Sequence, residues 1–315
     1  MLDELGVAAV IDQAAGPRPA GQPLSTGTYL ALAALGRLVA PCSKAAFAEW
    51  WKTTAADRFT KIGASALDHR RFWDAMHAVT LEQLEEASRA IAAKVVRVSG
   101  ADVSSVALDM TNFATFIATA DGKAPIAQRG KARQKRSDLR LAGLGLVVTR
   151  DGGLPLTWHA YPGDKPGVTQ FPDMIDQLKA QYEAVCAAAR AGAQAADMTV
   201  VFDSEAEFSF RQMKDPHVVS FSPMHHWTDH NIRVHVFTCV LALQLARLMR
   251  YRARRAGLDL SVRELLGQLA AIGETVLIYP STGGRPKARR MPTELTGHQP
   301  QLYQIFGLAR WAPRS

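Results

Sequence analysis

Two aspartates and a glutamate have the residue types and positions that a divalent metal site needs. Asp109 and Asp203 each follow an apolar, strand-like run, so we expect each to close a strand. Carboxylates at strand ends gather at the edge of an α/β sheet where ligands bind. Together with Glu207 they could hold Mg²⁺, which prefers carboxylate oxygens and in pairs promotes phosphoryl transfer. A turn or helix cap is the other common use of such an aspartate.

Glu207 begins the segment EFSFRQMK, which carries two cations at helical spacing. On a helix Glu207, Arg211 and Lys214 would form one stripe, and a carboxylate beside two cations suits a metal next to phosphate. Two other interpretations stay open. Glu207 and Arg211 have the spacing of a surface ion pair, and Ser204 with Glu207 has the spacing of a capping box.

A basic connector precedes the second strand-like segment and predicts contacts with nucleic-acid phosphates. A solvated basic loop would have the same composition. A weaker cluster of the same kind follows Gly283-Gly284, and the formal net charge of +8 also favours a polyanionic partner. The cations of the connector are Arg129, Lys131, Arg133, Lys135, Arg136 and Arg140, and those of the weaker cluster are Arg285, Lys287, Arg289 and Arg290.

Cysteine and histidine spacing argues against a zinc site. The three cysteines are far apart and form no C-x-x-C pair, so neither a disulfide scaffold nor a thiolate site is expected, and a reducing cytoplasm fits. His225, His226 and His230 lack the usual zinc spacing, which favours packing at a helix start or contact with phosphate. The apolar run 234–249 is interrupted by polar residues, which predicts a buried helix rather than a membrane span.

The elements that must position these residues change in character near Val103. Before it the pattern is helical, with helices over 29–39, after Ser43, over 67–77, and from a capping box at Thr80. After it come a strand reaching Asp109 and a hairpin around the turn at 150–153.

The second half of this region continues with a helix over 170–185 and a short buried strand over 198–203. A helix starts directly after Asp203. Asp229 is expected to cap a long helix over 232–254, and Ser261 with Glu264 forms a capping box. A strand follows near 274–280. The predicted class is therefore mixed α/β, and three strands, helix, strand, helix is an order compatible with a ribonuclease H-like domain.

Several segments together resemble bacterial insertion-sequence transposases of the Asp-Asp-Glu type, whose glutamate lies in a Tyr-Arg-Glu-Lys signature. These segments are LALAALGRLVAPCSK, VALDMTNF, RGKARQKRSDLRLAGLGLVVTRDGGLPLTWHAYPGD, EFSFRQMKDPHVVSFSPMHHWTDHNIRVHVF and YPSTGGRPKARRM. The resemblance implies a ribonuclease H-like core with Asp109, Asp203 and Glu207 as catalytic, metal-binding acids. Lys214 follows Glu207 at the spacing of the signature. The implied activity is cutting and joining of DNA ends with Mg²⁺, or with Mn²⁺ as a substitute.

The chain departs from this family between the second aspartate and the glutamate. Family members place a helix, a strand and usually a β-rich insertion domain there, whereas here three residues separate Asp203 from Glu207. Val200 and Asp203 also replace the signature's Tyr and Arg. We therefore expect three regions: residues 1–100, helical, for DNA-end binding or dimerisation; 101–256, a catalytic domain shortened near 203–204 that lacks the insertion domain; and 257–315, a short tail.

The resemblance makes a DNA transposase the leading hypothesis, and the internal deletion leaves open whether catalysis survives. The alternative is a catalytically dead remnant that binds DNA or regulates transposition, and a nuclease without strand transfer comes third. The expected partners are double-stranded transposon ends and, on DNA, further copies of this chain. The expected location is the bacterial cytoplasm, at the nucleoid, without a membrane.

Overall fold

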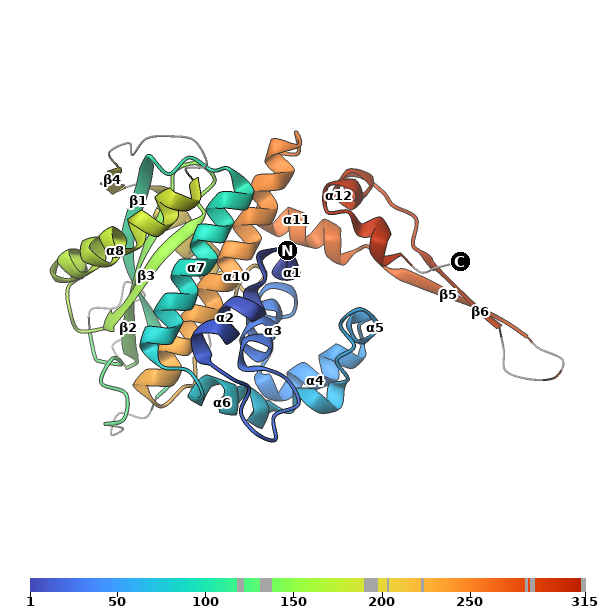
Figure 1. Ribbon diagram of the computed structural model, residues 1–315, viewed down its shortest axis with the longest axis horizontal. Helices are drawn as coiled ribbons and strands as arrows, with labels where there is room; N and C mark the ends of the chain where they lie inside the picture. Colours follow the sequence, from blue (N-terminus) through green and yellow to red (C-terminus); the bar gives the residue numbers. More distant parts are fainter. Residues whose placement is uncertain are drawn as a thin grey trace. The chain divides into compact units, whose positions relative to one another are not determined.

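The computed structural model describes residues 1–117, 122–130, 138–189, 198–202, 204–221, 224–280, 283 and 287–312. By compactness the chain divides into two units, Met1–Leu248 and Met249–Ser315. The predicted mixed α/β class is confirmed: a helical region precedes a four-stranded sheet with helices, and about 53% of the chain is helix and 16% strand. Figure 1 shows these elements in chain order.

The N-terminal helices form around local caps and one aromatic cluster. Ser43 caps α4 by accepting from the Ala46 amide, and Thr80 with Gln83 forms the predicted capping box of α7. Tyr29, Phe47 and Phe72 pack edge-to-face in the cluster. The helices are α1 (Leu2–Leu5), α2 (Val7–Ala15), α3 (Thr26–Val39), α4 (Lys44–Lys52), α5 (Ala56–Thr60), the 3-10 turn η1 (Ala64–Leu67), α6 (His69–His77) and α7 (Leu81–Ser99).

The sheet has the order β3-β2-β1-β4. Its first three strands are antiparallel neighbours, which confirms the predicted hairpin, and β4 runs parallel to β1. The strands are β1 (Ser105–Thr115), β2 (Arg140–Thr149), β3 (Pro155–Pro162) and β4 (Thr199–Phe202).

Two strand predictions need correction. Asp109 does not close its strand, because β1 continues to Thr115 by pairing with β2 down to the Thr115–Arg140 pair. The strand before Asp203 is not buried: β4 lies at the edge of the sheet, and Phe202 is 71% exposed. Among the described residues its outer edge has no strand beside it, and the exposed Phe202 ring packs against that of Phe171.

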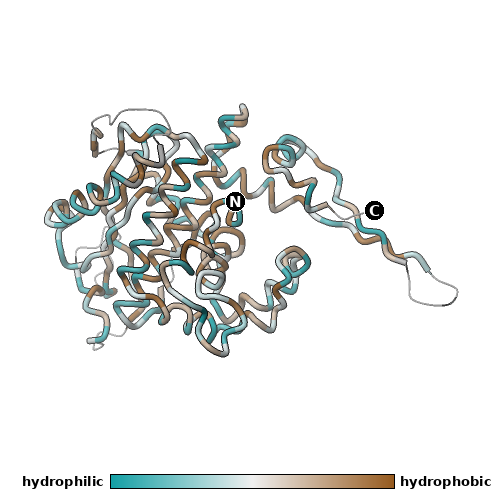
Figure 2. Tube along the Cα trace, in the orientation of Figure 1, coloured by the Kyte–Doolittle hydropathy of each residue, from teal (hydrophilic) through white to brown (hydrophobic). Residues whose placement is uncertain are grey.

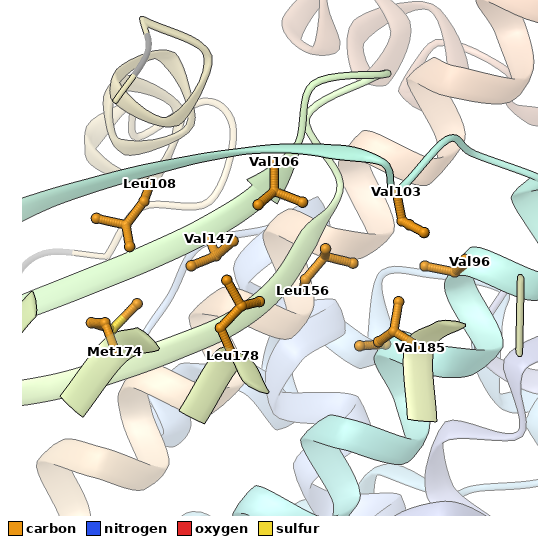
Figure 3. Close-up of a cluster of buried hydrophobic side chains, with 10 residues drawn as sticks. Val96, Val103, Val106, Leu108, Val147, Leu156, Met174, Leu178 and Val185 are labelled. Carbon is orange, nitrogen blue, oxygen red and sulfur yellow. The ribbon is translucent and has the colours of Figure 1, made fainter. Parts of the chain in front are cut away.

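The core of the sheet lies between its strands and two helices. Val106 and Leu108 of β1 meet Met174 and Leu178 of α8 (Phe171–Ala189), as Figure 3 shows. Helix α7 packs against α8 and β3, so the N-terminal helical region shares its unit with the sheet. The roles expected of residues 1–100, 101–256 and 257–315 stay predictions.

The helices that follow β4 are α9 (Ser204–Lys214) and α10 (Asp229–Arg255). Asp229 does not cap α10, because its carboxylate accepts hydrogen bonds from the Ile126 amide and the Arg233 side chain; instead the Thr228 hydroxyl accepts from the Asn231 amide. Helix α10 is long and apolar enough to cross a membrane, but 89% of its apolar window is buried inside the chain. The bent pair α3 and α4 passes the same length and composition test only when counted as one span.

The C-terminal unit has its own small core. Ala253, Leu258, Leu265 and Leu302 are buried together, and the predicted capping box of Ser261 with Glu264 is present. The elements of this unit, after the end of α10, are α11 (Val262–Ala270), β5 (Glu274–Tyr279), β6 (Lys287–Pro292), α12 (Gln299–Ile305) and the 3-10 turn η3 (Leu308–Trp311).

Candidate functional site

Asp109 lies within β1, on the sheet face opposite the core of Figure 3. Side chains alternate along a strand, so Asp109 shares its face with Thr111 and Phe113, whereas Leu108 points into that core. Asp109 is half-buried and pairs in register with Leu146 of β2. The adjacent pair across β1 and β4 is Leu108 with Phe202. Asp203, the residue after Phe202 in the chain, lies outside the described residues.

Lys214 lies close to the strand that carries Asp109. From the end of α9 its ammonium group donates to the Thr111 hydroxyl at 2.9 Å and lies 5.2 Å from the centre of the Phe113 ring. Because Thr111 is on the same face of β1 as Asp109, the Lys214 ammonium group lies on that face too. A cation there could contact a phosphate close to Asp109.

Glu207 is engaged by its neighbour on the same helix. Its carboxylate is 3.2 Å from the Arg211 guanidinium, and the Glu207 side chain is 51% exposed. This is the surface ion pair that the spacing allowed, and exposed pairs of this kind stabilise a helix by only about 0.2–0.5 kcal/mol. The competing capping box depends on the Ser204 side chain, which is outside the described part of the structure.

Sequence reasoning missed the ion pair that anchors α9. The Arg247 side chain of α10 is fully buried, and it donates to Glu205 at 3.1 Å and to the Ser209 hydroxyl at 3.0 Å. Gly153, at the turn between β2 and β3, has φ +64° and leaves the room this pair needs, since a Cβ there would collide with the Glu205 carboxylate. The available signal was an arginine within an apolar helix, because a buried arginine requires an acidic partner.

The two described cations at the ends of the basic connector differ in their surroundings. Arg129 is exposed, whereas Arg140 begins β2, is half-buried, and donates weakly to the Ala127 carbonyl at 3.4 Å. The other four predicted DNA contacts, Lys131, Arg133, Lys135 and Arg136, lie outside the described residues.

The histidines predicted to pack rather than bind zinc lie against other groups. His230 hydrogen-bonds to the Met76 carbonyl at 2.7 Å, and the His226 ring lies 5.1 Å from that of His235. Burial, helped by the nearby cations Lys44 and Arg37 and by His225, lowers the pKa of His226 to about 3. Burial also lowers the pKa of His235 well below its usual value, and its Nε2 donates to the Phe221 carbonyl.

These two histidines predict a fold that loses stability in acid. Their folded-state pKa values lie below the unfolded value near 6.5, so the unfolded chain binds more protons and stability falls as the pH drops below about 6.5. His226→Asn should therefore reduce the proton uptake on unfolding at pH 5 by about one. Urea unfolding across this pH range measures the uptake. The exposed neighbour variant His225→Asn is the control, and equal uptake in the parent and His226→Asn would contradict the assignment.

The described residues contain no group of three His, Cys, Asp or Glu side chains placed to hold a metal ion. Asp203, one of the three predicted ligands, lies outside the residues that were described, so this finding does not test the predicted site. Comparison of the chain with protein-family models, with characterised proteins and with solved structures finds no match.

Proposed function

We propose that this chain is a DNA-binding protein of the Asp-Asp-Glu transposase type, in which Asp109, Asp203 and Glu207 are the inherited acids. The observation that carries the proposal is the hydrogen bond from Lys214 to Thr111, two residues from Asp109 on the same strand. Lys214 and Asp109 are far apart in sequence, and each belongs to a segment that resembles this family. Their convergence on one face of β1 is what a phosphate-handling site of that type requires.

The strand order supports a ribonuclease H-like core. Three antiparallel strands are followed by a helix, a parallel strand and a second helix, as the resemblance implies. Asp109 follows the Leu108–Phe202 pair and Asp203 follows Phe202 in the chain. In the chain, both aspartates thus come directly after the last described pair between the parallel strands.

Among the described residues no strand lies beside the outer edge of β4, and this supports the proposed internal deletion. Native sheets usually cover or charge their edge strands, because an exposed apolar edge invites aggregation. Here Phe202 is 71% exposed and contacts the Phe171 ring at 5.3 Å between centroids. A helix and a strand are the elements that the family places after the second aspartate, and their loss would leave such an edge.

A second candidate function is favoured by Glu207. Its carboxylate pairs with Arg211 at the exposed surface of α9, and this pairing supports a remnant that binds DNA without cutting it. The donor set would bind Mg²⁺ or Mn²⁺ if it converged, because these ions prefer carboxylate oxygen. Asp203 lies outside the described residues, so no catalytic step is derived from the geometry.

DNA binding through phosphates is the part of the proposal that both candidates share. The affinity for duplex DNA should fall steeply with salt, since bound cations displace counterions, and the slope of log K against log salt is about −0.9 per neutralised phosphate. Replacing Arg133, Lys135 and Arg136 with Ala should reduce that slope. Fluorescence anisotropy with labelled duplex across salt concentrations makes the measurement.

The control for this experiment is a variant of equal charge change at exposed sites outside the connector, Lys52→Ala with Lys61→Ala and Lys165→Ala. If the connector variant titrates like this control, the connector is solvated surface. Binding to the ends of the element, mixed oligomers on DNA and a place at the bacterial nucleoid extend the same proposal.

A further inference from the structure

The positive charge of the chain is concentrated in its C-terminal unit. Residues 249–315 contain eleven Lys and Arg against four Asp and Glu, a formal charge of +7 out of the +8 of the whole chain. The larger unit is almost neutral, although it contains the basic connector. A polyanion would therefore be attracted most strongly by the C-terminal unit.

The most exposed part of this unit is the two-stranded ribbon of β5 and β6. Its register pairs Val276 with Arg290 and Leu277 with Arg289. Because side chains alternate along a strand, each face of the ribbon combines apolar side chains of β5 with an arginine of β6. The apolar strand is open to solvent: Ile278 is 70% exposed, and Val276, Leu277 and Tyr279 are each exposed by two fifths or more. The hydropathy of the ribbon along its length is drawn in Figure 2.

Such a ribbon is unusual as a free element. A two-stranded hairpin by itself is only marginally stable in water, and contiguous exposed apolar residues mark a binding surface. Within the described residues of the C-terminal unit, the helices α11 and α12 lie at the base of the ribbon and do not extend along it (Figure 1). Both faces of the ribbon are thus available within that unit.

We propose that the β5–β6 ribbon binds duplex DNA by lying in a groove, with Arg290 on a phosphate and Val276 and Ile278, on the same face, against the sugars and base edges. A two-stranded ribbon fits the width of the major groove, and DNA-bending ribbons insert apolar side chains from the minor groove. The ribbon and its register supply both kinds of contact. The inference shares with the proposed function the premise that the ligand is DNA, but it does not depend on strand cleavage.

Glu274 is the acidic residue of the ribbon, and it holds Arg290 at 3.1 Å. This pair is partly exposed, and exposed ion pairs are worth about 1 kcal/mol or less. A phosphate can therefore replace the Glu274 carboxylate as the partner of Arg290 at little cost. Before DNA binds, the ion pair with Glu274 keeps the Arg290 side chain oriented.

A second copy of the chain is the other occupant that an apolar ribbon could accept. Joining two copies through this surface would bring together two units with a charge of +7 each, which repel, whereas DNA neutralises them. Charge therefore favours DNA, and the oligomeric state belongs among the measurements.

The test uses the full chain and a short duplex of unrelated sequence. The variant Arg289→Ala with Arg290→Ala is compared with Arg254→Ala with Arg263→Ala, which removes the same charge from exposed helix positions of the same unit. Loss of the phosphate contact of Arg290 should lower the salt slope by about 0.9 in the ribbon variant, and the slope should be nearly unchanged in the control. Ile278→Ser should weaken binding severalfold while the salt slope stays the same. Circular dichroism checks that every variant is folded.

Equal slopes for the two double variants would overturn the inference. It would also fail if Ile278→Ser converts a dimer to a monomer in sedimentation experiments without changing DNA affinity, because the ribbon would then be a contact between copies. If the parent chain does not bind DNA, the proposed function fails as well. If the parent binds and only the ribbon variants have no effect, the inference alone is wrong.

Discussion

Glu205→Gln should lower the free energy of unfolding by about 2–3 kcal/mol, whereas Glu207→Gln should change it by less than about 0.5 kcal/mol. Glu205 is the partner of the fully buried Arg247, so its loss leaves a buried cation without its counter-charge. Removing one member of a buried pair costs about 3–5 kcal/mol, and we expect less here because Glu205 is 33% exposed. Glu207 makes only an exposed pair with Arg211.

Urea unfolding of both variants at neutral pH and one salt concentration measures the difference. The two glutamates are two residues apart on α9, so the comparison keeps the helix, the substitution and the charge change constant. Equal losses for both variants would mean that Arg247 does not depend on Glu205. A large loss for Glu207→Gln alone would mean that Glu207 has a partner that stabilises the fold more than its exposed pair with Arg211 does.

The result also distinguishes a glutamate that stabilises the fold from one that does not, which the sequence alone cannot do. Glu205 and Glu207 both precede the cations of α9, and only their surroundings show which one holds the helix in place. If Glu207 contributes little to stability, the need to stabilise the fold does not explain its presence, and a role in function does. If Glu205 contributes much, its ion pair with Arg247 is the contact that holds α9 against α10.

Local signals were predictable from the sequence, and contacts between distant segments were not. The capping boxes at Thr80 and Ser261 involve residues three apart, so the pattern alone is sufficient to find them. The length of β1 depends on its pairing with β2, and the capping role expected of Asp229 was lost because the Ile126 amide, far away in sequence, binds its carboxylate. No local pattern contains that information.

The candidate site was predictable to a similar degree. The helical stripe of Glu207, Arg211 and Lys214 placed three residues on α9, but not the direction each side chain takes. Lys214 contacts Thr111 of β1, whereas Glu207 and Arg211 pair with each other. The exposure of β4 was also missed, because an apolar run predicts a buried strand only where a neighbouring element covers it.

Under the proposed function, we expect purified protein to cleave transposon ends very slowly or not at all in Mg²⁺ or Mn²⁺. Two-metal phosphoryl transfer requires carboxylates held within about half an ångström of their productive positions. Under the proposed function, the three residues between Asp203 and Glu207 stand in place of the helix and strand that transposases of this type have there. Glu207, paired with Arg211 at the surface, has no described contact that directs it toward Asp109.

Gel assays of strand cleavage and joining, with DNA that carries the terminal repeats flanking the gene, measure the activity. Asp109→Asn serves as the control for contaminating nuclease, because it removes a carboxylate that catalysis would require and keeps nearly the same size and shape. The parent and Asp109→Asn should both bind the DNA, with equal and near-background cleavage. Robust cleavage and joining by the parent that disappears in Asp109→Asn would refute this expectation. It would mean that a three-residue connection still lets Glu207 reach the two aspartates on DNA.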